Sequence, residues 1–161
     1  SGAIGIQCID TAEAYGLKLG ELSVESRKKL AALNDTLGNH PVDVGPASAT
    51  VGAGIFDMYK KCFDILREDD NIDCIYLNGY ISHGLKPAYY EELLRYIGSC
   101  REKPMVCWCY GPSKQLVHEF GELAERCGIP FYLTTRKAVR SLSYMARYAK
   151  WRNAVWSPCR P

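Results

Sequence analysis

Apolar residues recur along most of this chain at intervals of three and four, the spacing that places side chains on one face of an α-helix. The pattern and its caps predict six helices. They cover Ala3 to Tyr15, the stretch from a Ser23 cap to a break at Gly38, Gly52 to Arg67, Pro87 to Ile97, the stretch from a Ser113 cap to Arg126, and a last helix from Thr134 or Thr135 to about Trp151. Gly16 is expected to end the first helix in a left-handed conformation.

Short, continuous apolar runs between turn residues predict buried strands. The clearest are Ile72 to Leu77 and Met105 to Tyr110, while Phe131 to Leu133 and Pro41 to Val44 predict shorter ones. Val24 and Leu33 are expected on the buried side of their helix with Leu30. In the last helix the apolar stripe runs through Leu142, Met145 and Ala149, among others.

Strands that alternate with helices imply right-handed βαβ units and a parallel sheet covered on both faces. We therefore predict an α/β fold, a flavodoxin-like doubly wound parallel sheet in a three-layer αβα domain. The domain is expected over residues 1–152, with an extended tail over 153–161. Such a domain normally has a strand before its first helix, so either that strand lies outside this sequence or the sheet is one strand short.

The totals fit one domain with a real core, since the chain has 161 residues and 47% hydrophobic content. A net charge of +2 gives no electrostatic reason to expect nucleic acid or a membrane surface as a partner. The 8 cysteines show neither CxxC spacing nor a zinc-type pairing with histidine, so reduced core thiols and no metal are expected. We therefore expect the protein to be cytoplasmic.

Ligands of doubly wound sheets gather where strands end and helices begin. Four segments should meet at that edge: Ser1 to Gly5, Pro41 to Pro46, Asn78 to Gly84, and Tyr110 to Ser113. The first is a helix start built of small residues, which leaves backbone N–H groups accessible to an anion. The other candidate site-lining residues are Asn39, His40, Asp43, Gly79, His83 and Gly111. Each of these also fits an ordinary turn or loop role, and no residue has the partners of a catalytic nucleophile or base.

The ordered segments SGAIG, GLKLGELSVESRKKL, GNHPVDVGPAS, DDNIDCIYL, KPMVCW and CGIPFYLTTRKAVRSLSYMARYAKW resemble a known family. It is the succinyl-CoA-synthetase-like flavodoxin domain of NDP-forming acyl-CoA synthetases, the ADP-forming acetate–CoA ligase group. The resemblance covers Ser1 to Trp151 and is closest to the later of that family's two flavodoxin-like domains.

The resemblance implies a part of an acid–CoA ligase that uses CoA, ATP or ADP and Mg²⁺ in the complete enzyme, with no cofactor held by this domain alone. The implied partners are a phosphohistidine-bearing flavodoxin-like domain, a CoA-binding domain and ATP-grasp domains. By similarity, Ser1, Gly2, Ala3 and Gly5 stabilise the phosphohistidine at a helix N-terminus. The isolated chain is expected to be inactive.

Three departures from the family pattern stand out. Ala3 stands where a second glycine is usual, and the Ser-His-Thr-Gly phosphohistidine motif is absent from the chain. The usual Asn-Pro-Val-Asp sequence reads Asn-His-Pro-Val-Asp over residues 39–43, so either His40 replaces the asparagine or one residue is inserted. An alternative is therefore an acyl-CoA-binding regulatory module like that of protein lysine acetyltransferases, without ligase turnover. A free-standing FMN carrier is disfavoured, because no flavodoxin-type phosphate loop follows a first strand. His118 is expected at a packed or surface position in its helix.

Overall fold

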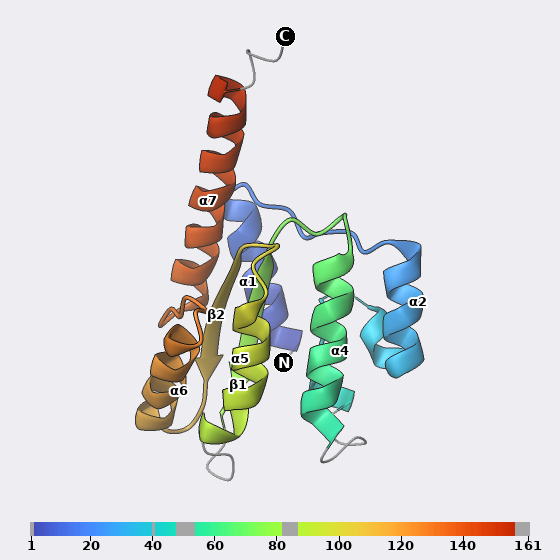
Figure 1. Ribbon diagram of the computed structural model, residues 1–161, viewed down its shortest axis with the longest axis vertical. Coiled ribbons are helices and arrows are strands. Elements are labelled where there is room, and N and C mark those ends of the chain that lie inside the picture. Colours follow the sequence, from blue (N-terminus) through green and yellow to red (C-terminus); the bar gives the residue numbers. More distant parts are fainter. Residues whose placement is uncertain (1, 40, 48–53, 82–86, 157–161) are drawn as a thin grey trace.

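The fold was analysed in a computed structural model, which describes residues 2–39, 41–47, 54–81 and 87–156. Its elements alternate helix and strand through the second half of the chain (Figure 1). In order they are α1 (Gly2–Ala14), α2 (Val24–Leu33), the 3-10 turn η1 (Asp35–Gly38), α4 (Ile55–Glu68), β1 (Ile75–Tyr80), the 3-10 turn η3 (Pro87–Tyr90), α5 (Glu91–Ser99), β2 (Met105–Tyr110), α6 (Lys114–Arg126) and α7 (Thr135–Trp156).

The two strands form a parallel sheet, as the alternation of elements predicts. β1 and β2 pair in register from Ile75 opposite Met105 to Tyr80 opposite Tyr110. α5 lies between them in the sequence and makes the crossover that a parallel connection requires. The fold is therefore α/β, and the strands that the structure describes form a two-stranded sheet.

Helices cover both faces of β2, because its side chains alternate between two groups of core residues. Cys107 and Cys109 belong to the main core, which also holds buried residues of α4, α5 and α6. Val106 points the other way and packs with Ala138 and Leu142 of α7. A third core, around Leu30 and Met58, joins α2 to α4. The sheet thus provides the surface against which the later helices pack.

The helix caps lie where the sequence predicts them. The Ser23 hydroxyl oxygen accepts a hydrogen bond from the N–H of Ser26, and Ser113 caps α6 in the same way through the N–H of Leu116. Gly16 and Gly128 close their helices with φ of 76° and 83°, the left-handed conformation that glycine adopts without strain.

The strand predictions were less accurate. β1 begins at Ile75 rather than Ile72, because the N–H of Ile72 donates to the carbonyl of Asp69 in the turn that follows α4. Residues 41–44 do not form the predicted strand. The segment at 131–133 makes one parallel bridge, Phe131 to Cys107, in place of a strand. Short strands depend on the partner that supplies their hydrogen bonds, and spacing in the sequence does not show that partner.

Further predictions about helices need correction. The second helix ends at Leu33 and not at the break at Gly38, because Asn34 is extended. Val24 is exposed rather than on the buried side of α2, because it is the first residue of the helix and lies outside the core around Leu30. α7 continues to Trp156, so the extended tail predicted from residue 153 is wrong for 153–156. The rest of that tail, 157–161, lies outside the described residues.

Seven cysteines lie among the described residues, and all are free thiols. Cys107 and Cys109 are buried on the same side of β2, as predicted for residues two apart in a strand. Cys159 lies outside the described residues. These thiols pack as small apolar side chains.

Candidate functional site

The first turn of α1 lies against the segment that carries two of the candidate residues. A Cβ atom placed on Gly5 would come within 2.6 Å of Cγ of Pro41. Gly2 and Ala3 belong to the same turn. The first four N–H groups of a helix have no partner within it and carry the positive end of the helix dipole. The start of α1 can therefore stabilise an anion that reaches it.

Asp43 stabilises the turn that follows this segment. The N–H of Gly45 donates to Oδ1 of Asp43 over 2.9 Å. This is a side-chain turn of the kind that aspartate forms in loops. Asn39 follows η1 in an extended conformation and is exposed. The structure thus assigns Asp43 a loop-stabilising contact, one of the two roles expected from the sequence.

Tyr59 of α4 connects this loop to the ends of the strands. Burial raises the pKa of Tyr59 to about 12, and the neighbouring Tyr90 and Asp43 act in the same direction. Tyr110, the last residue of β2, contributes to the same rise. Tyr59 packs against the core that contains Ile81 and against the core that contains Val44, so α4 brings the loop and the strand ends together.

The two candidate glycines at the ends of the strands differ in how tightly they are packed. Gly79 lies opposite Cys109, and a Cβ there would meet ordinary contacts of 3.4 Å and 3.6 Å. At Gly111 a Cβ would stand 2.2 Å from the carbonyl oxygen of Ile81. The close approach of two backbones therefore explains Gly111, so its presence requires no ligand.

Aromatic side chains lie together at the same ends of the strands, an arrangement that was not predicted from the sequence. Tyr80 and Tyr110 are paired in the sheet, with ring centroids 5.1 Å apart. The hydroxyl of Tyr90 donates to the carbonyl of Tyr80 over 3.2 Å, and its ring meets Phe56 edge-on at 5.3 Å. The sequence did contain a signal, since both strands end in tyrosine, and residues at matching strand ends share an edge.

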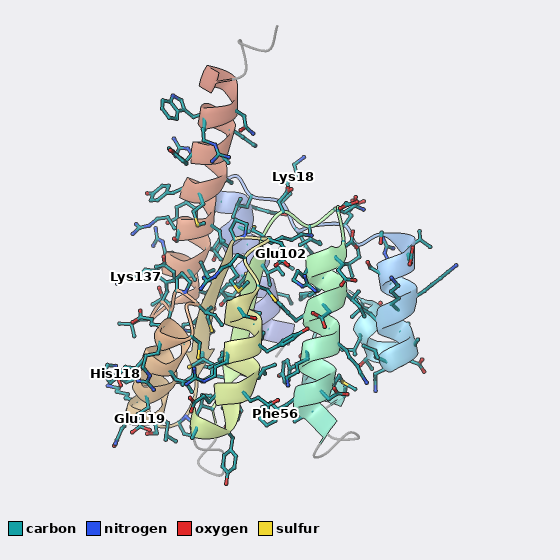
Figure 2. All side chains as sticks on the ribbon, in the orientation of Figure 1. Lys18, Phe56, Glu102, His118, Glu119 and Lys137 are labelled. Atoms are coloured by element: carbon teal, nitrogen blue, oxygen red, sulfur yellow. The ribbon has the colours of Figure 1, made fainter. Side chains whose placement is uncertain are left out.

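Three candidate residues, Ser1, His40 and His83, lie outside the described residues. His118 is exposed on α6, with its Nε2 atom 3.5 Å from Oε1 of Glu122. Figure 2 shows it on the outer side of α6, near Glu119. Within the described ranges no group of three or more histidine, cysteine, aspartate or glutamate side chains is placed to hold a metal ion. None of the helices described is long and apolar enough to cross a membrane.

Comparisons with known proteins show which proteins this chain is similar to. No family profile matches the chain. A curated relative, acetate–CoA ligase [ADP-forming] I of Archaeoglobus fulgidus, is 28% identical over 153 residues, which is 93% of this chain and 20% of that protein. The chain is similar to part of this ADP-forming acetate–CoA ligase. It spans about a fifth of the length of this ligase.

Two solved structures have a fold similar to that of this chain. The protein PH0766 of Pyrococcus horikoshii OT3 matches with a TM-score of 0.73 and 20% identity, over 93% of this chain and 34% of that one. The dinucleotide-forming acetyl-coenzyme A synthetase 1 of Ca. Korarchaeum cryptofilum, in its apo form, matches with a TM-score of 0.71 and 18% identity, over 100% of this chain and 34% of the other. The fold resembles about one third of each longer chain.

Proposed function

We propose that this chain is a flavodoxin-like, three-layer αβα domain of an NDP-forming acyl-CoA synthetase, and that the start of α1 helps to form its phosphohistidine and acyl-phosphate site. The observation that carries the proposal is the 28% identity to an ADP-forming acetate–CoA ligase over 93% of the chain. The contact between Gly5 and Pro41 supports it, because it sets the helix start beside the candidate loop.

The role of α1 in this proposal is electrostatic. A phosphoryl group on a partner domain carries negative charge, and the free amides of the first turn can donate hydrogen bonds to it. Gly2 and Ala3 allow a close approach because they have little or no side chain. Ser1 belongs to the proposed site by resemblance. His40, Asp43 and His83 are proposed to line it because the sequence predicts them at the same edge of the sheet. The domain holds the phosphoryl group in place, and no catalytic side chain is assigned to it.

The complete reaction requires parts beyond this domain. We propose that a phosphohistidine-bearing flavodoxin-like domain, a CoA-binding domain and ATP-grasp domains work beside it, in the same chain or in other subunits. CoA, ATP or ADP and Mg²⁺ would bind in the complete enzyme, in the cytoplasm. The isolated chain is then inactive: supplied with acetyl-CoA, ADP and phosphate, it should form no ATP. The regulatory alternative gains no support from the relatives, since the curated one is named as a ligase.

The test is Gly2→Glu in the full-length gene product. A carboxylate in the first turn stabilises the helix itself, by roughly 0.3–1 kcal/mol, but repels a phosphoryl group at the same place. We therefore expect an intact fold together with a loss of phosphoryl transfer of about 100-fold, the scale seen when one transition-state donor is removed. Transfer is measured as acetyl-CoA-dependent formation of ATP from ADP and phosphate.

Gln7→Glu is the matched control, because it adds the same charge to an exposed position of α1 beyond the first turn. It should leave turnover within about twofold of the unmodified enzyme, since the dipole effect is confined to the first turn. Unchanged turnover in Gly2→Glu would overturn the role of the helix start. A full-length protein with no ligase activity in its unmodified form would overturn the proposed function itself.

A further inference from the structure

α7 consists of two halves that differ in what covers them. In the first half, Ala138, Val139 and Leu142 are buried, and Ala138 and Leu142 pack on Val106 of β2. From Tyr144 to Asn153 no residue is buried. Figure 1 shows the reason, because the C-terminal half of α7 extends well past the sheet and the other helices. We call this stretch, residues 144–153, the projecting half of α7.

The projecting half keeps the apolar spacing of a packed helix although nothing in the described structure covers it. Tyr144, Met145, Tyr148 and Trp151 recur at intervals of three and four and are 44% to 60% exposed. The rings of Tyr148 and Trp151 lie 5.8 Å apart. A groove of about 490 Å³ runs along this face, lined by Pro104, Ser141, Tyr144, Met145, Tyr148, Ala149 and Arg152.

The charge on this helix has one sign. α7 carries 6 arginine and lysine residues, and none of its side chains is acidic. Near its start, Arg136 donates to the hydroxyl of Tyr15 over 3.0 Å, and Arg140 lies over the ring of Tyr144.

The basic residues of the projecting half are Arg147, Lys150 and Arg152. They form no ion pair with any residue that the structure describes. Arg152 lines the groove itself, and the projecting half as a whole is basic.

We propose that the projecting half of α7 is a docking surface for another folded protein domain, whose contact surface is apolar at its centre and acidic at its rim. Aromatic, methionine and arginine side chains are the types enriched at protein interfaces and at their energetic centres. The basic side chains of the projecting half match an acidic partner and oppose a basic one. This inference does not depend on the proposed ligase function.

The same observations disfavour two other occupants. A second copy of the chain would bring two basic helices together, and like charges at an interface repel each other. A membrane-surface helix normally inserts a broad face rich in tryptophan, phenylalanine and leucine. The projecting half is short, because the first half of α7 is held against β2, and it has one tryptophan and no leucine or phenylalanine. A protein surface suits such side chains.

The experiment is photocrosslinking of the full-length gene product in its source cells, with p-benzoylphenylalanine in place of Tyr148. The matched control carries the same group in place of Val24, an equally exposed residue on α2, which Figure 1 places far from α7. We expect position 148, and not position 24, to crosslink to one peptide segment, identified by mass spectrometry, with aspartate or glutamate nearby. Combined Arg147→Glu, Lys150→Glu and Arg152→Glu changes should lower the yield at least about tenfold.

The decisive step is rescue: changing the acidic residues of the crosslinked segment to lysine should restore the yield with the charge-reversed helix. Circular dichroism checks that both proteins remain folded. Equal crosslinking from positions 148 and 24, crosslinks to a second copy of the chain, or a yield that charge reversal leaves unchanged would each overturn the proposal. It is also overturned if position 148 forms no protein crosslink, whether or not the protein binds vesicles of 70% phosphatidylcholine and 30% phosphatidylserine through residues 147–152.

Discussion

Gly5 of α1 lies so close to Pro41 that a Cβ atom at Gly5 would stand 2.6 Å from Cγ of the proline ring. Real Cβ atoms essentially never approach another atom within 3.0 Å, so the contact as it stands requires glycine. It fixes the distance between the helix start and the loop that leads to Asp43. Two parts of the proposed site, far apart in the sequence, are therefore held together by the absence of a side chain.

Gly5→Ala tests this contact. Alanine favours a helix over glycine by about 1 kcal/mol, so a neutral position would gain stability. We expect instead that overpacking against Pro41 lowers the free energy of unfolding by about 1–3 kcal/mol, measured by urea denaturation. Gln7→Ala, an exposed change on the same helix, is the control. A Gly5→Ala protein more stable than the unmodified one would show that the helix and the loop separate freely.

A pair of glycine changes separates packing from ligand contact at the ends of the strands. Gly111→Ala should lower the free energy of unfolding by about 3 kcal/mol, because its Cβ would meet the carbonyl oxygen of Ile81 at 2.2 Å. The Cβ of Gly79→Ala meets only ordinary contacts of 3.4 Å and 3.6 Å, so this change should lower the free energy of unfolding by about 1 kcal/mol at most. Thermal unfolding of both variants measures the difference. Equal losses would contradict this account of Gly111.

Asp69 links the start of α2 to the end of α4 through a hydrogen bond, and its carboxylate makes the free energy of unfolding depend on pH. Its carboxylate accepts hydrogen bonds from the N–H groups of Ser23, at 2.9 Å, and Asn71, at 3.0 Å. Burial acts to raise its pKa, but these bonds and those of the serine hydroxyls outweigh it and lower the pKa from 3.8 to about 2. Because the folded pKa is the lower one, the stabilisation is complete above about pH 4 and is lost as the pH falls towards 2.

We therefore expect Asp69→Asn to lower the free energy of unfolding by about 1–3 kcal/mol at pH 7 and to remove part of the acid sensitivity between pH 4 and 2. Urea denaturation across this pH range gives both quantities. Asp35→Asn, at an exposed position, is the control. If Asp69→Asn destabilised the protein equally at pH 7 and pH 2, the effect would be one of packing and not of charge.

The cysteines should react in two stages. Cys107 and Cys109 are buried, and burial raises the pKa of both thiols, that of Cys109 to about 12. Because the thiolate is the reactive form, these two should resist a disulfide reagent at pH 8 until the protein unfolds. In guanidinium, without a reductant, all 8 cysteines of the chain should react. Fewer than 8 would indicate a disulfide or a tightly bound metal.

Features that depend on neighbours in the sequence could be predicted well. The caps at Ser23 and Ser113 are hydrogen bonds across three residues, and the left-handed Gly16 ends a helix that precedes it directly. The bounds of β2, Met105–Tyr110, agree with the prediction because an apolar run lies between polar and glycine–proline breaks. The helix start at Gly2 and Ala3 was likewise readable, and it supplied the candidate anion site.

Tertiary structure decided the rest, because its determinants lie far apart in the sequence. β1 begins at Ile75 since β2 offers Met105 as the partner there. Met145 fits the apolar stripe of α7 but is exposed, because the stripe continues past the end of the sheet that covers Leu142. The sequence by itself determined which segments are helical, through contacts of three or four residues. Which surfaces those helices cover, and which they leave for a partner, depends on long-range packing that only the folded chain defines.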